Sequence, residues 1–152
     1  TQEVLTASGT WTCPQNVFSV RIKAWGAGGN GYSASNGNAG GGGEYAEKVF
    51  TTVPGTGYSY VVGTPGVANT SFNTTTVIAV NGSNGGAPGS PGAGGTGGTG
   101  TIKINGGTGY LLVTGGSSNG APSSYGTTGI IPGGGGGVTS GAGARGQIVL
   151  EY

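Results

Sequence analysis

Histidine and aspartate are both absent from this 152-residue sequence. Their absence excludes Ser-His-Asp and Cys-His catalytic arrangements, histidine-based metal sites and the usual general bases. Carboxylates are few, and the nearest pair is Glu44 and Glu47. Because these two residues are three positions apart on a predicted strand, their side chains should point to opposite faces, which does not suit a paired acid and base. The sequence therefore predicts a protein that is not an enzyme and binds no metal or cofactor.

Charged residues and long apolar runs are scarce too. Charged residues make up 6 % of the chain, against about 25 % in a typical domain, and the net charge is +1. The five Lys and Arg residues are scattered, which excludes neutralisation of a nucleic-acid backbone. No run of about 18 apolar residues is present, so the sequence predicts no membrane span. A weakly charged chain rich in Thr, Ser, Asn and Gly favours a protein that packs into an assembly or faces the outside of the cell.

Cys13 is the single cysteine, so no disulfide can form within the chain. Two interpretations stay open, namely a buried, unreactive thiol and an intermolecular bridge. Methionine is absent, and the sequence shows no signal peptide. We expect either that processing has removed a leader before Thr1 or that the chain is a piece of a longer protein, and we favour processing.

Glycine is what the sequence has in excess, with 40 residues gathered into runs between strand-like segments. Each glycine in regular structure costs about 0.5–1 kcal/mol relative to alanine. That cost is offset where a missing side chain is needed, either for turns with positive φ or for close approach of backbones. The length fits one domain over residues 1–152. We therefore expect a single rigid β-module with glycine-rich loops, extracellular or on a virion surface.

Alternating apolar and polar residues predict several β-strands. The clearest covers residues 17–25, in which Phe18, Val20, Ile22 and Ala24 share one face. No window has a useful 3.6-residue amphipathic period, so helix content should be close to nil. These patterns favour an all-β fold, a β-sandwich of jelly-roll-like architecture. The other predicted strands cover residues 4–11, 44–53, 58–62, 70–72, 76–80, 101–104, 110–113 and 147–152.

Five consecutive triplets begin with glycine over residues 86–100, in the order GAP, GSP, GAG, GTG and GTG. A three-residue period is typical of polyproline-II-type helices, which have three residues per turn and no internal hydrogen bonds. We interpret this stretch as an extended, polyglycine II segment that packs its glycine face against the glycine runs at 40–43 and 133–137. The backbone amides of such neighbours can bond laterally. The alternative is a set of flexible loops.

Several polar side chains are candidates for contact or modification. Tyr32 and Tyr125 lie inside glycine-rich stretches, and tyrosine on a rigid loop is a common contact residue for glycans and proteins. The alternative is that these tyrosines only cover glycine backbone. Three N-x-S/T sequons make Asn69, Asn73 and Asn81 candidate glycosylation sites.

Four strand-bearing pieces follow one another along the chain. They are GTWT with the later VFSVRIKAWGAGGNG, then GGGGEYAEKVFTTVPGTGYSYVVGTPG, then TSFNTTTVIAVNGSNGG, and last GARGQIVLEY. Together they resemble the glycine-rich domain of phage tail-fibre and other virion surface proteins, over nearly the whole chain. The resemblance implies a β-sandwich with glycine-rich loops at one end, which serves attachment or fibre assembly without catalytic residues. Cys13 and the lower glycine content of residues 101–128 depart from that pattern. The resemblance therefore does not specify the tip loops or a receptor site on them.

Three functions fit these observations. We favour a structural subunit of an extracellular fibre or virion appendage that assembles with copies of itself, as a filament or a trimer. Residues 2–8, with the apolar Val4, Leu5 and Ala7, are the candidate exchanged strand, since addition to a sheet edge is a low-cost joining mode. The alternative is a receptor- or glycan-binding tip that presents residues 26–43, 84–100 and 115–137. An ice-binding protein, the minor alternative, predicts triplets through most of the chain, whereas only residues 86–100 carry them.

Overall fold

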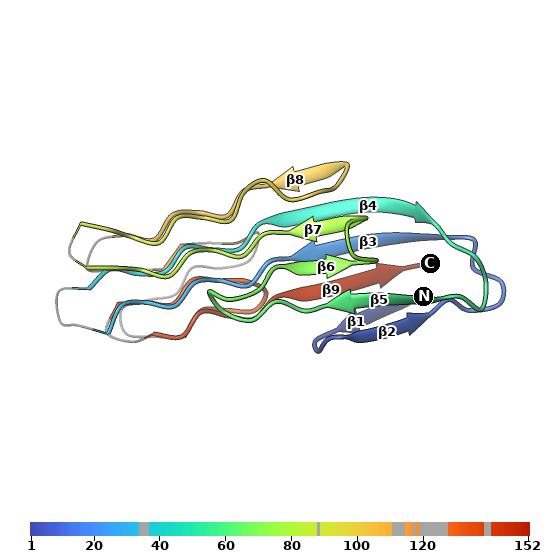
Figure 1. The fold of residues 1–152 in the computed structure, drawn as a ribbon, viewed down its shortest axis with the longest axis horizontal. Helices are drawn as coiled ribbons and strands as arrows, with labels where there is room; N and C mark the ends of the chain where they lie inside the picture. The colour runs from blue at the N-terminus through green and yellow to red at the C-terminus, as the bar shows by residue number, and fades with distance from the viewer. Residues whose placement is uncertain (34–36, 88, 111–114, 117, 119–127, 139–140) are drawn as a thin grey trace.

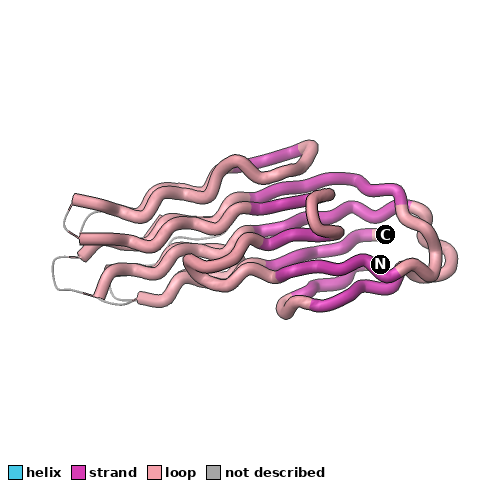
Figure 2. The backbone as a smooth tube through the Cα atoms, viewed as in Figure 1, coloured by secondary structure: helices cyan, strands magenta, loops and turns pink. Residues whose placement is uncertain are grey.

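The computed structural model describes the chain except for residues 34–36, 88, 111–114, 117, 119–127 and 139–140. The described part is all-β, as the sequence predicts, and contains no helix, hence none that could cross a membrane. Its strands gather at one end of an elongated molecule, and the glycine-rich segments continue from them to the other end (Figures 1 and 2). The strands are β1 (Gln2–Leu5), β2 (Gly9–Thr12), β3 (Ser19–Trp25), β4 (Tyr45–Thr51), β5 (Gly57–Val61), β6 (Thr70–Phe72), β7 (Val77–Ala79), β8 (Ile102–Ile104) and β9 (Gln147–Glu151).

Two antiparallel sheets form a sandwich-like arrangement. One has the strand order β1-β9-β3-β4-β8, and the other has the order β2-β5-β6-β7. The prediction of one strand over residues 4–11 is wrong, because the chain leaves the first sheet after Leu5 and enters the second at Gly9. Ser8 stabilises this crossing, since its hydroxyl accepts the Val62 N–H at 3.0 Å.

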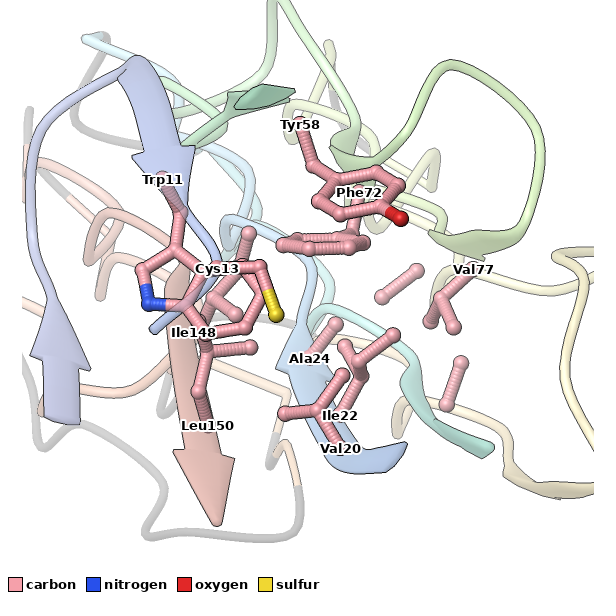
Figure 3. Close-up of a cluster of buried hydrophobic side chains, with 12 residues drawn as sticks. Trp11, Cys13, Val20, Ile22, Ala24, Tyr58, Phe72, Val77, Ile148 and Leu150 are labelled. Carbon is pink, nitrogen blue, oxygen red and sulfur yellow. The ribbon is translucent and has the colours of Figure 1, made fainter. Parts of the chain in front are cut away.

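The core lies between the two sheets (Figure 3). Val20, Ile22 and Ala24 alternate inward along β3 and are fully buried, as the alternation predicts. Phe18 is the exception, because it precedes the first paired residue of β3 and is 66 % exposed. The opposite wall of the core is aromatic, and Phe72 packs there with its ring centroid 6.1 Å from that of Trp11 and 6.0 Å from that of Tyr58.

Ion pairs stabilise the outer face of the five-stranded sheet. Arg21 and Lys23 point away from the core on β3. Arg21 Nε lies 3.3 Å from Glu47 Oε1 on β4, and Lys23 Nζ lies 2.7 Å from Glu151 Oε1 on β9. Because both pairs are partly exposed, each contributes on the order of 1 kcal/mol or less to stability. The outer face is thus polar around cross-strand pairs, whereas the inner face is apolar.

Cys13 is buried at the edge of this core, and its thiol donates to the Val17 carbonyl oxygen at 3.1 Å. A buried thiol of this kind behaves as a small apolar residue. The structure therefore supports the interpretation of Cys13 as a packing residue, and its burial disfavours an intermolecular bridge.

Candidate functional site

The glycine-rich segments form one bundle, organised around a central segment at residues 38–44. Successive amides of this segment donate to three different neighbours. Ala39 and Gly42 donate to residues 110 and 107, Gly40 and Gly43 to residues 136 and 133, and Gly41 and Glu44 to residues 83 and 80, all at 2.8–3.3 Å. Each neighbour thus receives every third amide. This three-residue period is the one that a polyglycine II segment predicts.

The carbonyl oxygens of the central segment accept bonds from three further segments. Ala39 and Gly42 accept the amides of Gly92 and Gly95, Gly41 accepts that of Gly29, and Gly40 accepts that of Gly116. Six other segments therefore surround residues 38–44 laterally. The network satisfies buried backbone groups that neither sheet could reach.

Many positions at which these segments approach one another cannot accommodate a side chain. A Cβ built on Gly41 would lie 2.0 Å from the Ala93 carbonyl oxygen, and one on Gly43 would lie 2.0 Å from the Gly26 oxygen. Real Cβ atoms do not approach backbone oxygens to this distance, so the close approach accounts for the glycines. Along the triplet stretch, several of the residues that separate the glycines are exposed, as Ser90, Ala93 and Thr96 are.

The sequence predicts that the triplet stretch packs against two glycine runs, and the structure confirms one of these two contacts. Gly95 donates to Gly42 within the run at 40–43, and Gly92 donates to Ala39 directly before it. The run at 133–137 instead bonds to another side of the central segment, and no bond joins it to the triplets within the described ranges. The bundle also extends far beyond the triplets, since segments without that repeat take part.

Glu44 marks the junction between the bundle and the sandwich. Its side chain is fully buried, and Oε2 accepts the N–H of Val80 at 3.1 Å and that of Gly98 at 2.8 Å. Glu47 points to the outer face beside Arg21, so the two carboxylates lie on opposite sides, as predicted. Glu44 takes the place of a carbonyl acceptor where neighbouring segments change from strand to bundle geometry, which is a structural role.

Glu47, on the outer face, also affects the hydroxyl group of Tyr45. The hydroxyl of Tyr45 donates to Glu47 Oε2. Burial, together with this hydrogen bond and the nearby negative charge, raises the pKa of the Tyr45 hydroxyl far above its ordinary value. Tyr45 therefore stays protonated and acts as a fixed hydrogen-bond donor on this face.

The far end of the bundle brings two tyrosines to neighbouring positions around the central segment. The Tyr32 amide donates to the Asn38 carbonyl oxygen at 2.9 Å, and the Ala39 amide donates to the backbone carbonyl oxygen of Tyr110 at 3.3 Å. Tyr32 is 38 % exposed and Tyr110 is 66 % exposed. Sequence reasoning missed Tyr110 because it assigned that residue to a strand, although the preceding GGTG run indicates a glycine segment. Tyr125 and most of the strand predicted at 110–113 lie outside the described residues.

Asn38 secures this far end from inside. Its side chain is 1 % exposed, and Nδ2 donates to the carbonyl oxygens of Gly86 at 3.2 Å and Ala87 at 2.6 Å. The central segment is thereby bonded to the first triplet of the stretch 86–100. The backbone that carries both tyrosine side chains is consequently hydrogen-bonded to neighbouring segments.

The N-terminal residues lie at an edge of the five-stranded sheet. Val4 and Leu5 belong to β1, which pairs with β9 and with no other strand that the structure describes. Ala7 lies in the exposed bend that follows. The ends of the chain meet here, since the Tyr152 amide donates to the Thr1 carbonyl oxygen at 3.0 Å. The Tyr152 hydroxyl donates to Glu3, and this bond, with a smaller effect of burial, raises the pKa of Tyr152.

The three sequon asparagines flank β6 and β7. Asn69 directly precedes β6, Asn73 lies in the turn between the two strands, and Asn81 follows β7. Asn69 is exposed, and its Oδ1 accepts the Asn81 N–H at 3.0 Å. The amide nitrogens of the other two already donate within the chain, from Asn73 Nδ2 to Thr76 Oγ1 at 3.2 Å and from Asn81 Nδ2 to the Gly82 oxygen at 3.1 Å. Asn69 is therefore the sequon whose amide nitrogen is the most accessible of the three.

The described residues hold no cluster of three or more side chains suited to a metal ion. The geometry instead joins a sandwich to a laterally bonded bundle with aromatic residues at its far end. The resemblance to the glycine-rich domain of phage tail-fibre proteins rests on its four motifs alone, since no protein-family model matches the chain and no curated protein matches its sequence.

Proposed function

We propose that this chain is a non-enzymatic structural module of an extracellular or virion-surface appendage, which holds a contact surface for a glycan or protein receptor at the far end of its glycine bundle. The observation that carries the proposal is the lateral bonding of the central segment to six neighbours. A surface built on such a frame is preorganised, so little conformational entropy is lost when a ligand binds.

The position of the chain ends supports this arrangement. Thr1 and Tyr152 are hydrogen-bonded to each other on the sandwich, whereas the bundle projects away from them (Figure 1). Attachment through the sandwich would leave the far end free to meet a receptor. The same geometry separates the surface that joins an assembly from the surface that contacts a ligand.

The chemistry of the far end favours a neutral ligand such as a glycan. The described residues at this end are uncharged, and the exposed ones include Tyr32, Ser90 and Tyr110. Aromatic rings stack on the apolar faces of sugars, while hydroxyl and amide groups bond to sugar hydroxyls. A phosphorylated or strongly acidic ligand would find no cation among these residues.

Tyr32→Ala and Tyr110→Ala are each expected to weaken receptor binding about tenfold or more, because tyrosine anchors often account for at least 1.4 kcal/mol of binding free energy. A glycan array followed by titration of the best ligand measures the effect. Tyr125→Ala belongs in the same series. Phe18→Ala is the matched control, since Phe18 is an aromatic residue at the sandwich end that is as exposed as Tyr110. Unchanged affinity in all the tyrosine variants, or an equal loss in the control, would refute the proposal.

Self-assembly through the N-terminal strand is a second candidate function. The observation that favours it is the edge position of β1, whose four residues pair with β9 alone among the described strands and alternate between exposed and half-buried. A strand with one neighbour separates from its sheet more readily than an internal strand, and it can add to an edge of another copy.

Negative-stain electron microscopy of the purified protein tests this second candidate. Wild type should form filaments or rings, and deletion of residues 1–8 should leave monomers. A synthetic peptide of residues 1–8 should also shorten wild-type filaments by occupying the acceptor edge, while a scrambled peptide should not. Filaments that persist after the deletion would rule out exchange of β1.

A further inference from the structure

Strand β4 has an edge that is only half covered. Along one side it pairs with β3 over all seven residues, whereas on the other side β8 pairs only with Tyr45–Glu47. The Glu47 carbonyl oxygen faces the β8 side, because it accepts the Thr101 N–H at 2.7 Å. Alternation along an antiparallel strand then directs the N–H and C=O groups of Val49 and Thr51 to that same side. No residue that the structure describes pairs with them there.

The phase of this alternation is supported by the other side of the strand. The Thr52 amide donates to the Phe18 carbonyl oxygen at 2.9 Å, on the β3 side. Even-numbered residues of this region therefore bond towards β3, and odd-numbered residues bond towards β8. Val49 and Thr51 present two donors and two acceptors at the spacing of a strand, which is the pattern that an added extended chain recognises.

A cavity of about 210 Å³ lies beside this open edge, at the place where β8 would continue. Its apolar walls are Val49 and Ile102, whose side chains are 58 % and 50 % exposed. The other lining residues are Arg21, Glu47, Lys48 and Thr101. An added strand would place every second side chain on the outer face of the sheet, against these two apolar residues.

The charges of the cavity favour an acidic partner. Arg21 and Lys48 are balanced only by Glu47, so the lining carries one excess positive charge. The Arg21 side chain is 52 % exposed and pairs with Glu47 through Nε, and Lys48 takes part in no ion pair with the residues described. Two copies of this chain joined through the same edge would bring their own Arg21 and Lys48 side chains into one interface. Charge therefore favours a different protein over a second copy.

We propose that the open edge of β4 binds an extended peptide segment of a partner protein as an added strand, with an apolar side chain against Val49 and Ile102 and a carboxylate beside Arg21. Lys48, which lies opposite the buried Ile22, adds positive charge from the other face of the same edge. The site is separate from the far end of the bundle and does not rest on the receptor proposal. It would allow the sandwich to be joined laterally to another component while the bundle stays free.

The test uses a fluorescently labelled hexapeptide that alternates threonine and valine and ends in glutamate with a free carboxylate. Fluorescence anisotropy should detect saturable binding to the wild-type protein, and Lys48→Glu should weaken it about tenfold through lost attraction and added repulsion. Lys103→Glu is the matched control, because it makes the same change of charge on β8 at a residue outside the cavity lining. A hexapeptide with proline at its third position should bind at least about tenfold more weakly, since it loses a backbone donor.

Four results would overturn the proposal. One is the absence of binding by wild type at millimolar peptide. Another is an equal loss of affinity in Lys48→Glu and Lys103→Glu, or equal binding of the proline peptide, which would mean that neither the cavity nor the strand edge is used. The last is concentration-dependent dimerisation in analytical ultracentrifugation that Lys48→Glu abolishes, which would identify a second copy as the occupant.

Discussion

Gly41→Ala is expected to lower the free energy of unfolding by about 3 kcal/mol, at the upper end of the range for overpacked cores. The added methyl group would lie 2.0 Å from the Ala93 carbonyl oxygen and 2.4 Å from its carbon. Both atoms belong to backbone that is bonded laterally, so the clash cannot be relieved by turning a side chain. In a chain of this length, such a loss corresponds to a fall in Tm of about 10 °C.

Gly86→Ala is the matched control for this substitution. A Cβ at Gly86 would approach no atom closer than 3.3 Å, where it would meet Ser90 Cβ. Alanine there should change stability by about 0.5 kcal/mol or less, since a small contact cost is offset by a stiffer unfolded chain. Thermal unfolding followed by differential scanning calorimetry compares the two variants. Equal melting temperatures would mean that the bundle does not depend on close backbone approach.

Phe72→Ala should produce the largest loss from the sandwich, about 3–5 kcal/mol. Phe72 is fully buried, and its ring lies 6.4 Å or less from those of Trp11, Phe50 and Tyr58 by centroid distance. Alanine would leave a cavity that three other aromatic side chains, themselves held by packing, cannot fill. The loss should appear as a lower urea midpoint with an unchanged slope.

Phe18→Ala is the control for the core substitution, because it removes the same atoms from a ring that is 66 % exposed. We expect it to change the free energy of unfolding by about 0.5 kcal/mol or less. A loss in Phe18→Ala as large as that in Phe72→Ala would contradict the assignment of the core to the space between the two sheets.

The strands of the sandwich were largely predictable from the sequence, since burial on one face leaves a period of two. Val20, Ile22 and Ala24 carry that period, and all three are buried. The break between β1 and β2 was not predictable in this way. Residues 4–11 contain no proline, and what divides them is the passage of the chain from one sheet to the other.

The bundle was predictable only where side chains repeat. Residues 86–100 have outward side chains at every third position, which exposes the period in the sequence. Residues 40–43 of the central segment are all glycine and therefore carry no side-chain pattern, although six segments surround them. Which runs lie together depends on bonds between residues far apart in the chain, as between Gly40 and Gly136. Composition cannot specify such partners, and for the same reason Tyr110 was not assigned to the far end.

The three-residue period of the lateral bonds also restricts how this molecule could change in length. An insertion of one or two residues in a bundle segment would turn every later amide towards a different neighbour and place side chains where only glycine fits. An insertion of three residues keeps each amide facing its partner segment and adds about 9 Å, one turn of a polyglycine II helix. Matched triplets added to all segments would thus lengthen the molecule in whole turns and leave its far surface in the same orientation. The length of the bundle and the orientation of its far surface therefore both depend on the number of residues in each segment, and they stay matched when that number changes by multiples of three.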